Sequence, residues 1–327
     1  MAQRGRTVSA EGGALALSRA FFEETALPML EKEFPEAAKR AAAGLVGNGS
    51  ECFGYDDEIS RDHDWGVDFF LWVPEEDRGL IPALSEWKRR VLALVPEGYA
   101  RSLSQYGAEP GVMTVGDFYK SLIGCPRAPE RLGEWLAVPE ENLAMAVNGE
   151  VFRDPAGEFS AVRRELERHY PDDILLKRMS VCCMEMAQTG QYNYRRCALR
   201  GDVPALREVT ARFSRAAAHL SFLLARRYMP YYKWAFRALA ELPAPGFEVA
   251  ALLTEIASEP GLDEAAFSRQ TERIEAVCDL LGAELRRRGL SGAEGDFFVG
   301  HGEALRARIS LAALRDLPAQ YDPFRRG

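Results

Sequence analysis

The run WGVDFFLWV, residues 65–73, constrains the fold more than any other stretch of the chain. It has the composition of a strand, but it is too apolar for a strand with one face in water. Such a strand needs neighbours on both sides and cover on both faces. The run therefore predicts a central strand in a sheet.

Other segments of the first half supply further strands and the helices that would cover the sheet. Three more strands are expected: LVGNG (45–49), which ends in a turn, GVMTV (111–115), and GEVFRDPAGEF (149–159), which closes in a Pro-Ala-Gly turn. Helical periodicity marks 15–34, 79–94, 117–123 and 140–147, and FPEAAKRAAAGL (34–45) has the pattern of a second short helix with Pro35 in its first turn. We expect four or five strands flanked by helices.

After Ser160 the pattern changes to successive helices joined by linkers that contain Pro or Gly. The expected helices are 161–170, 173–189, 204–229, 231–242, 247–258, 263–288 and 302–317. The predicted class is α+β, with a mixed-sheet domain at residues 1–158 and an all-α helical bundle at 159–327.

Composition restricts the compartment and the partners. The 327 residues are 47% apolar, enough for one large or two ordinary domains, and carry a formal net charge of −8. An acidic chain has no general affinity for nucleic acid. The six cysteines form no Cys-x-x-Cys pair, the N-terminus makes a poor signal peptide, and no run reaches the roughly 18 apolar residues of a membrane span. We expect a cytoplasmic protein with no membrane partner.

Two carboxylates stand directly before the apolar run. Asp62 and Asp64 are two residues apart, so on a strand both side chains point to one face and can meet one cation. Two carboxylates together with substrate phosphates are a common way to hold Mg²⁺. Upstream, Gly49 permits a tight turn, and Ser50 offers a hydroxyl and an N–H to a phosphate. The acids of the loop between them, such as Asp56 and Asp57, are expected to be mostly solvated.

The order GNGS, eleven residues, DHDWG resembles the signature of the nucleotidyltransferase superfamily, which includes DNA polymerase β and the kanamycin and streptomycin adenylyltransferases. The longer string GSECFGYDDEISRDHDWG is similar to one bacterial branch of unknown function, and so are GEVFRDPAGEF, QYNYRRCALRGD and RRYMPYYKW.

The resemblance implies that Gly49 and Ser50 hold the phosphates of a nucleoside triphosphate and that Asp62 and Asp64 bind Mg²⁺. It implies transfer of a nucleoside monophosphate, with AMP from ATP favoured, to a hydroxyl of a small molecule. The acceptor and the oligomeric state stay open.

The superfamily usually has a third carboxylate on a later strand, where this chain has Gly111, Val112 and Met113. Glu109 lies just before that strand and is the expected base. Asp68 is a second candidate, and Asp117 is expected to cap the following helix. Without a third acid the chain would be a nucleotide-binding or sensing protein that does no chemistry, and this alternative is kept.

Cations and aromatic residues gather around Pro230, which should break a helix. The segment is either a packed helix junction or an anion-binding wall formed by Arg226, Arg227, Tyr232 and Lys233. The QYNYRRCALRGD segment is open to the same two interpretations. Arg212 and His219 match the loose pattern of a small ribonuclease module, which we attribute to chance.

Overall fold

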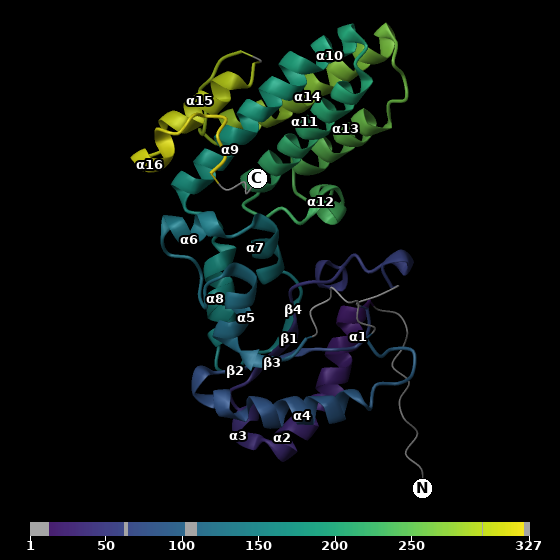
Figure 1. Ribbon diagram of the computed structural model, residues 1–327, viewed down its shortest axis with the longest axis vertical. Helices are drawn as coiled ribbons and strands as arrows, with labels where there is room; N and C mark the ends of the chain where they lie inside the picture. Colours follow the sequence, from purple (N-terminus) through teal and green to yellow (C-terminus); the bar gives the residue numbers. More distant parts are fainter. Residues whose placement is uncertain (1–12, 62–64, 102–109, 296, 324–327) are drawn as a thin grey trace. The chain divides into compact units, whose positions relative to one another are not determined.

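A computed structural model of the chain describes residues 13–61, 65–101, 110–295 and 297–323 (Figure 1). The chain divides into two compact units, Met1–Arg168 and His169–Gly327. The boundary therefore falls after Arg168 and not near residue 158 as predicted. The reason is the helix Glu158–Glu167, whose Phe159 ring stacks 4.0 Å from the ring of Trp72 in the sheet.

The first unit contains a four-stranded mixed sheet in the order β3-β2-β1-β4, which confirms the predicted α+β class. The strands are β1 (Ala42–Leu45), β2 (Phe70–Val73), β3 (Val112–Thr114) and β4 (Glu150–Arg153). β2 lies inside the sheet, as its apolar sequence predicts, and is antiparallel to β1 and parallel to β3. β4 pairs antiparallel with β1.

Strand β1 corrects one prediction. Its alanines were expected to continue a helix, but the helix of this segment covers only Pro35–Ala38, and Ala42–Leu45 form a fully buried strand. A β-carbon on Gly44 would clash with the carbonyl oxygen of Glu150 on β4. Small residues are thus needed where β1 passes closely between two strands, and this packing overrides helix propensity.

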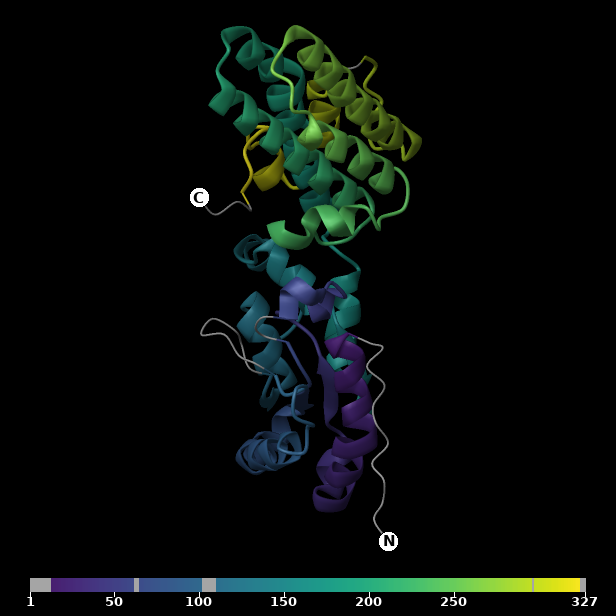
Figure 2. The same cartoon turned by 90° about the vertical axis from the view of Figure 1, so that its right-hand side faces the viewer.

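Helices cover both faces of the sheet (Figure 1 and Figure 2). On one face, Phe69, Leu71 and Val73 belong to a core shared with residues of α1, α2 and α4, among them Leu30 and Trp87. On the other face, the rings of Phe70, Trp72, Phe118, Tyr119 and Phe159 pack with their centres within 5.5 Å of a neighbouring ring.

The helical elements of the unit are α1 (Ala14–Phe21), π-helical η1 (Phe22–Ala26), α2 (Leu27–Glu33), α3 (Pro35–Ala38), 3₁₀-helical η2 (Glu51–Phe53), η3 (Glu58–Arg61) and η4 (Glu75–Leu80), α4 (Ile81–Leu92), α5 (Val115–Ile123), α6 (Leu132–Ala137), α7 (Glu140–Ala146) and α8 (Glu158–Glu167).

The second unit, over the residues described there, is built of helices alone, as the sequence predicts. They are α9 (Asp172–Met186), π-helical η5 (Ala187–Asn193), α10 (Tyr194–Arg200), α11 (Val203–Leu224), α12 (Tyr232–Leu239), α13 (Gly246–Ser258), α14 (Glu264–Arg287), α15 (Val299–Ala307) and α16 (Ala312–Arg315). The sequence did not predict η5 and α10, which continue α9. Gly190 in η5 lies against the ring of Phe213 and leaves no room for a side chain, so close packing selects glycine there.

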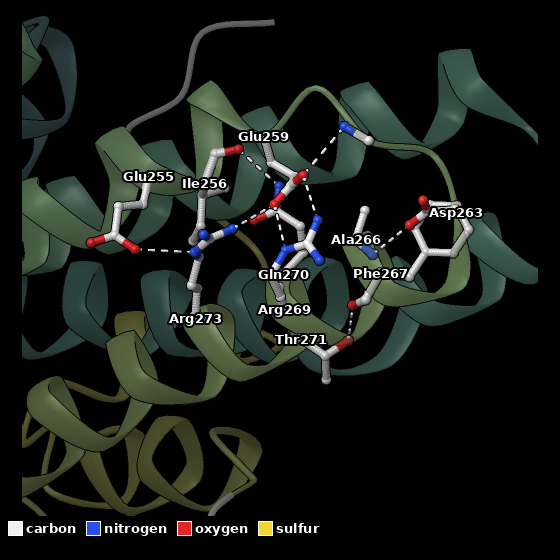
Figure 3. Close-up of polar contacts among 11 residues, drawn as sticks. Glu255, Ile256, Glu259, Asp263, Ala266, Phe267, Arg269, Gln270, Thr271 and Arg273 are labelled. Carbon is white, nitrogen blue, oxygen red and sulfur yellow. Dashed lines mark hydrogen bonds and ion pairs between the residues drawn. The ribbon is translucent and has the colours of Figure 1, made fainter.

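Glu259, just after α13, ties that helix to α14 (Figure 3). Its carboxylate accepts hydrogen bonds from Arg269 at 3.0 and 3.1 Å and from Arg273 at 2.9 Å. These arginines hold the pKa of Glu259 down, at about 2. One carboxylate thus joins the end of α13 to two arginines of α14.

No helix in the described ranges has both the length and the hydrophobicity needed to cross a membrane.

Candidate functional site

Three segments that the sequence assigns to the site approach one end of the sheet. Gly44 near the end of β1 lies opposite Phe70 at the start of β2, and Leu71 lies opposite Val112 at the start of the parallel strand β3. The loop that leaves β1 and the segments that lead into β2 and β3 therefore meet at the same end. Gly49 and Ser50 lie in that loop, Asp62 and Asp64 precede β2 along the chain, and Glu109 precedes β3.

The loop after β1 is fixed to the segment before β4. The amide of Asn148 exchanges two hydrogen bonds with the backbone of Gly47, each 2.8 Å long. The N–H of Gly149 donates to the carbonyl of Cys52 at 2.7 Å. These bonds hold the loop from both sides, so the position of Ser50 is set by the scaffold.

Gly49 and Ser50 form the expected tight turn. Gly49 has a φ of +125°, a conformation that favours glycine. The carbonyl of Ser50 accepts from the N–H groups of Phe53 at 3.1 Å and Tyr55 at 2.9 Å, which closes the turn. The Ser50 hydroxyl makes no capping hydrogen bond to the turn that follows. The backbone of Ser50 is thus used for structure, whereas its hydroxyl is available to a ligand.

A buried ion pair lies next to this turn, and sequence reasoning missed it. Nη2 of Arg101 is 2.8 Å from Oε1 of Glu51, and the two side chains are only 6% and 2% exposed. Burial raises the pKa of Glu51, and the charge of Arg101 opposes that rise. The two residues are far apart in sequence, so no local pattern could pair them.

Asp57 and Glu58 of this loop are exposed, as predicted, but Asp56 and Asp57 also hold the local structure. Asp56 accepts from the N–H of Ala14 at 2.7 Å and from the indole of Trp65 at 2.9 Å, so it links the first turn of α1 to the residue that follows Asp64. Asp57 accepts from the N–H of Ser60 at 3.0 Å and holds η3.

The predicted metal ligands Asp62 and Asp64 and the predicted base Glu109 lie outside the described residues. Across the described part of the chain, no group of three or more His, Cys, Asp or Glu side chains could hold a metal ion. A Mg²⁺ site at Asp62 and Asp64 therefore stays a prediction.

Asp68 is engaged elsewhere and is not available as a third acid. Its Oδ1 lies 2.6 Å from Nζ of Lys88, and both side chains are buried. The same oxygen accepts from the N–H of Phe69 at 2.7 Å. Burial raises the pKa of Asp68, and Lys88 opposes the rise. This pair is a structural contact inside the unit.

Asp117 is not the helix cap that the sequence predicts. The cap of α5 is Thr114, whose hydroxyl accepts from the N–H of Asp117 at 3.1 Å. The Asp117 carboxylate instead binds Arg78 at 2.7 Å on the surface, and this hydrogen bond lowers its pKa.

Arg226 ends α11 and is anchored on the surface. Its φ is +50°, and its N–H donates to the carbonyl of Leu223 at 3.1 Å, which closes the helix. Its guanidinium lies 2.7 Å from the Asp172 carboxylate at the start of α9. Arg226 thus has a structural role that the sequence did not reveal.

Part of the segment around Pro230 is a packed helix junction, and part is exposed as an anion-binding wall would require. Tyr228 and Met229 are buried, as a packed junction requires. Tyr232 is 79% exposed, and Arg227 and Lys233 are exposed as well. These three side chains remain available to an anion. These side chains belong to the second unit, whereas the Gly49–Ser50 turn belongs to the first. A cleft lined by both units therefore stays a prediction.

The QYNYRRCALRGD segment likewise has both buried and exposed side chains. Tyr194 is buried in the core of the second unit, whereas Arg196 lies over the exposed ring of Tyr192, 3.7 Å from its centre. On α11, Arg212 binds Glu185 at 2.6 Å, while His219 contacts Arg178 and Cys182 at 3.3 Å each. Arg212 and His219 thus have different neighbours, and no ribonuclease site is inferred from them.

One family model, described as Domain of unknown function (DUF4037), matches residues 135–235. The match begins within α6, ends within α12, and does not include the Gly49–Ser50 turn. Comparison with curated proteins and with solved structures finds no match.

Proposed function

We propose that the chain is a magnesium-dependent nucleotidyltransferase that moves a nucleoside monophosphate, with AMP favoured, to a hydroxyl of a small molecule. One observation carries the proposal: the loop with Gly49 and Ser50 and the chain segments that lead into β2 and β3 lie at one end of the sheet. This is the arrangement that a phosphate turn, a metal pair and a base would need.

In the proposed reaction, the Ser50 hydroxyl donates a hydrogen bond to the terminal phosphates of the nucleotide. Asp62 and Asp64 would hold Mg²⁺, which would supply positive charge to stabilise the phosphate oxygens. The hydroxyl oxygen of the acceptor forms a bond to the α-phosphorus, and the bond from that phosphorus to pyrophosphate breaks. Glu109 takes the proton of the acceptor hydroxyl.

The alternative is a nucleotide-binding protein without transfer activity. It is favoured by the state of two other acids next to strands β2 and β3 in the sequence: Asp68 is paired with Lys88 and Asp117 with Arg78. Both are committed to cations, so Glu109 is left as the one candidate base from the sequence analysis. If Glu109 does not serve, the chain would hold nucleotide without turning it over.

The test uses ATP labelled at the α-phosphate, Mg²⁺, and a low-molecular-weight cell extract as the source of acceptors. We expect pyrophosphate release and transfer of the label to a small molecule, both lost in Asp64→Asn. Glu58→Gln, which removes an exposed acid from the same loop, is the matched control and should keep full activity. Nucleotide binding without pyrophosphate release would favour the alternative, and the absence of nucleotide binding would refute both.

A further inference from the structure

The buried pair of Glu51 and Arg101 has unused hydrogen-bonding capacity. A guanidinium carries five N–H donors. Among the described residues, neither Nε nor Nη1 of Arg101 has a hydrogen-bond partner, although both atoms are buried. Oε1 of Glu51 is close to Nη2 but also lacks a hydrogen bond of good geometry. Buried donors without partners are costly, so the pair is poorly satisfied in this state.

Two nearby acids of the described residues do not complete the pair. Asp68 is bound by Lys88, and Asp56 accepts from Ala14 and Trp65. Arg101 is held in place by its backbone, because Gly66 packs directly against its α-carbon and amide and leaves no room for a side chain. The backbone of Arg101 is therefore fixed, and its guanidinium lies beside Glu51 with two donors unused.

The Glu51 carboxylate lies against the backbone of the turn itself. A β-carbon placed on Gly49 would be 2.5 Å from both of its carboxylate oxygens. An anionic group of this protein thus sits on Gly49, between the turn and Arg101. Gly49 and Ser50 are themselves half-exposed, so a ligand can reach the turn from solvent.

We propose that the Glu51 carboxylate occupies the place of a substrate phosphate, and that Arg101 exchanges Glu51 for that phosphate when ligand binds. The inference rests on the proposed function for the kind of ligand, the polyphosphate of a nucleotide. A phosphate group offers more acceptor oxygens than one carboxylate and matches the fork of a guanidinium. It would give Nε and Nη1 the partners that Glu51 does not provide. Arg101 would then be a phosphate-binding residue, and Glu51 an internal competitor.

The test measures binding of inorganic tripolyphosphate with Mg²⁺ by calorimetry, without nucleoside or acceptor. Glu51→Gln keeps the size of the side chain and removes its charge, so binding should tighten about threefold or more. Arg101→Met should weaken binding about tenfold or more, as expected for loss of a charged hydrogen bond. An unchanged affinity in Arg101→Met, or weaker binding in Glu51→Gln, would overturn the proposal.

Arg101→Met alone leaves a buried carboxylate without its cation and can fail to fold. The double variant Glu51→Gln/Arg101→Met removes both charges, and it should fold and bind as weakly as expected for Arg101→Met. Glu33→Gln/Arg90→Met removes a more exposed pair of the same unit, joined at 2.6 Å, and is the matched control. It should bind tripolyphosphate like the wild type. Binding by the Glu51/Arg101 double variant at wild-type strength would contradict the exchange.

The outcome is separable from that of the proposed function. If the wild type transfers nucleotide but its affinity for tripolyphosphate does not depend on Arg101, the exchange is wrong and the function stands. If tripolyphosphate binding depends on Arg101 and no nucleotide is turned over, the anion site stands and the transferase is refuted. A wild type that does not bind tripolyphosphate overturns the exchange directly.

Discussion

The ammonium group of Lys88 lies 2.6 Å from the buried carboxylate of Asp68. It also donates a hydrogen bond of 2.6 Å to the carbonyl of Pro110. One cation on α4 therefore joins the segment that leads into β2 to the segment that leads into β3. This contact fixes Asp68 and Pro110, the residues just before the two parallel strands, to the same lysine.

Lys88→Met should be strongly destabilising, because it leaves Asp68 buried without a cation. Loss of one partner of a buried pair costs about 3–5 kcal/mol. The free energy of unfolding in urea measures the effect. Lys88→Met/Asp68→Asn removes both charges and should recover part of the loss. If the single variant is as stable as the wild type, the pair does not hold the strands together.

Ser50→Ala should separate ligand binding from folding. The hydroxyl does not cap the turn, so the free energy of unfolding should change by about 0.5 kcal/mol or less. Nucleotide affinity, measured by calorimetry with Mg²⁺, should fall about tenfold if the hydroxyl contacts a charged phosphate. Ser121→Ala, in which a hydroxyl bound to the carbonyl of Phe118 is removed, is the control and should bind normally. Normal binding by Ser50→Ala would remove this contact from the proposal.

Lys233→Ala tests the anion wall of the second unit. Its side chain is exposed and contacts the ring of Trp234, so the melting temperature should change little. Binding of nucleotide or of an anionic acceptor should weaken about tenfold, as for a lost charged hydrogen bond. Lys120→Ala removes an exposed lysine of the first unit and should have no such effect. A variant that melts earlier but binds normally would assign Lys233 to packing.

Glu109→Gln should reduce turnover by a factor of about 10² to 10⁴, the usual contribution of a general base, with little change in nucleotide affinity. Asp117→Asn is the comparison, because Asp117 pairs with Arg78 in a largely exposed contact. It should cost less than about 1 kcal/mol of stability and leave turnover unchanged. Thr114→Ala removes the true cap of α5 and should cost about 1 kcal/mol. Equal turnover in Glu109→Gln and the wild type would refute the base.

Glu259 makes the second unit sensitive to acid. Its pKa is about 2 when folded, against 4.5 for an ordinary glutamate, because Arg269 and Arg273 favour the charged form. A lowered folded pKa gives stability that is present above the unfolded pKa and is lost as the pH falls toward the folded value. Between about pH 5 and about pH 2, the wild type should lose more thermal stability than Glu259→Gln. Parallel loss in both proteins would show that Glu259 does not contribute.

Several features of the fold follow from sequence because they depend on neighbouring residues. The apolar run at 65–73 requires cover on both faces, and β2 indeed lies inside the sheet. Helical periodicity after Ser160 predicted the all-helical class of the second unit and most of its helices, though not η5 and α10, since a helix shows its buried side in its own sequence. The Gly49 turn was likewise recognisable, because a positive φ selects glycine locally.

Tertiary structure decided what depends on distant partners. Ala42–Leu45 form a strand because β2 and β4 lie on either side of them, although their own propensity is helical. Arg101 and Glu51 meet only after the chain folds, and no local period relates two side chains so far apart. The same holds for Lys88 with Asp68 and for Arg226 with Asp172. The sequence alone determined the class of fold and the turn of the candidate site, whereas folding decided which charges pair with distant residues and which buried donors of the described residues lack a partner.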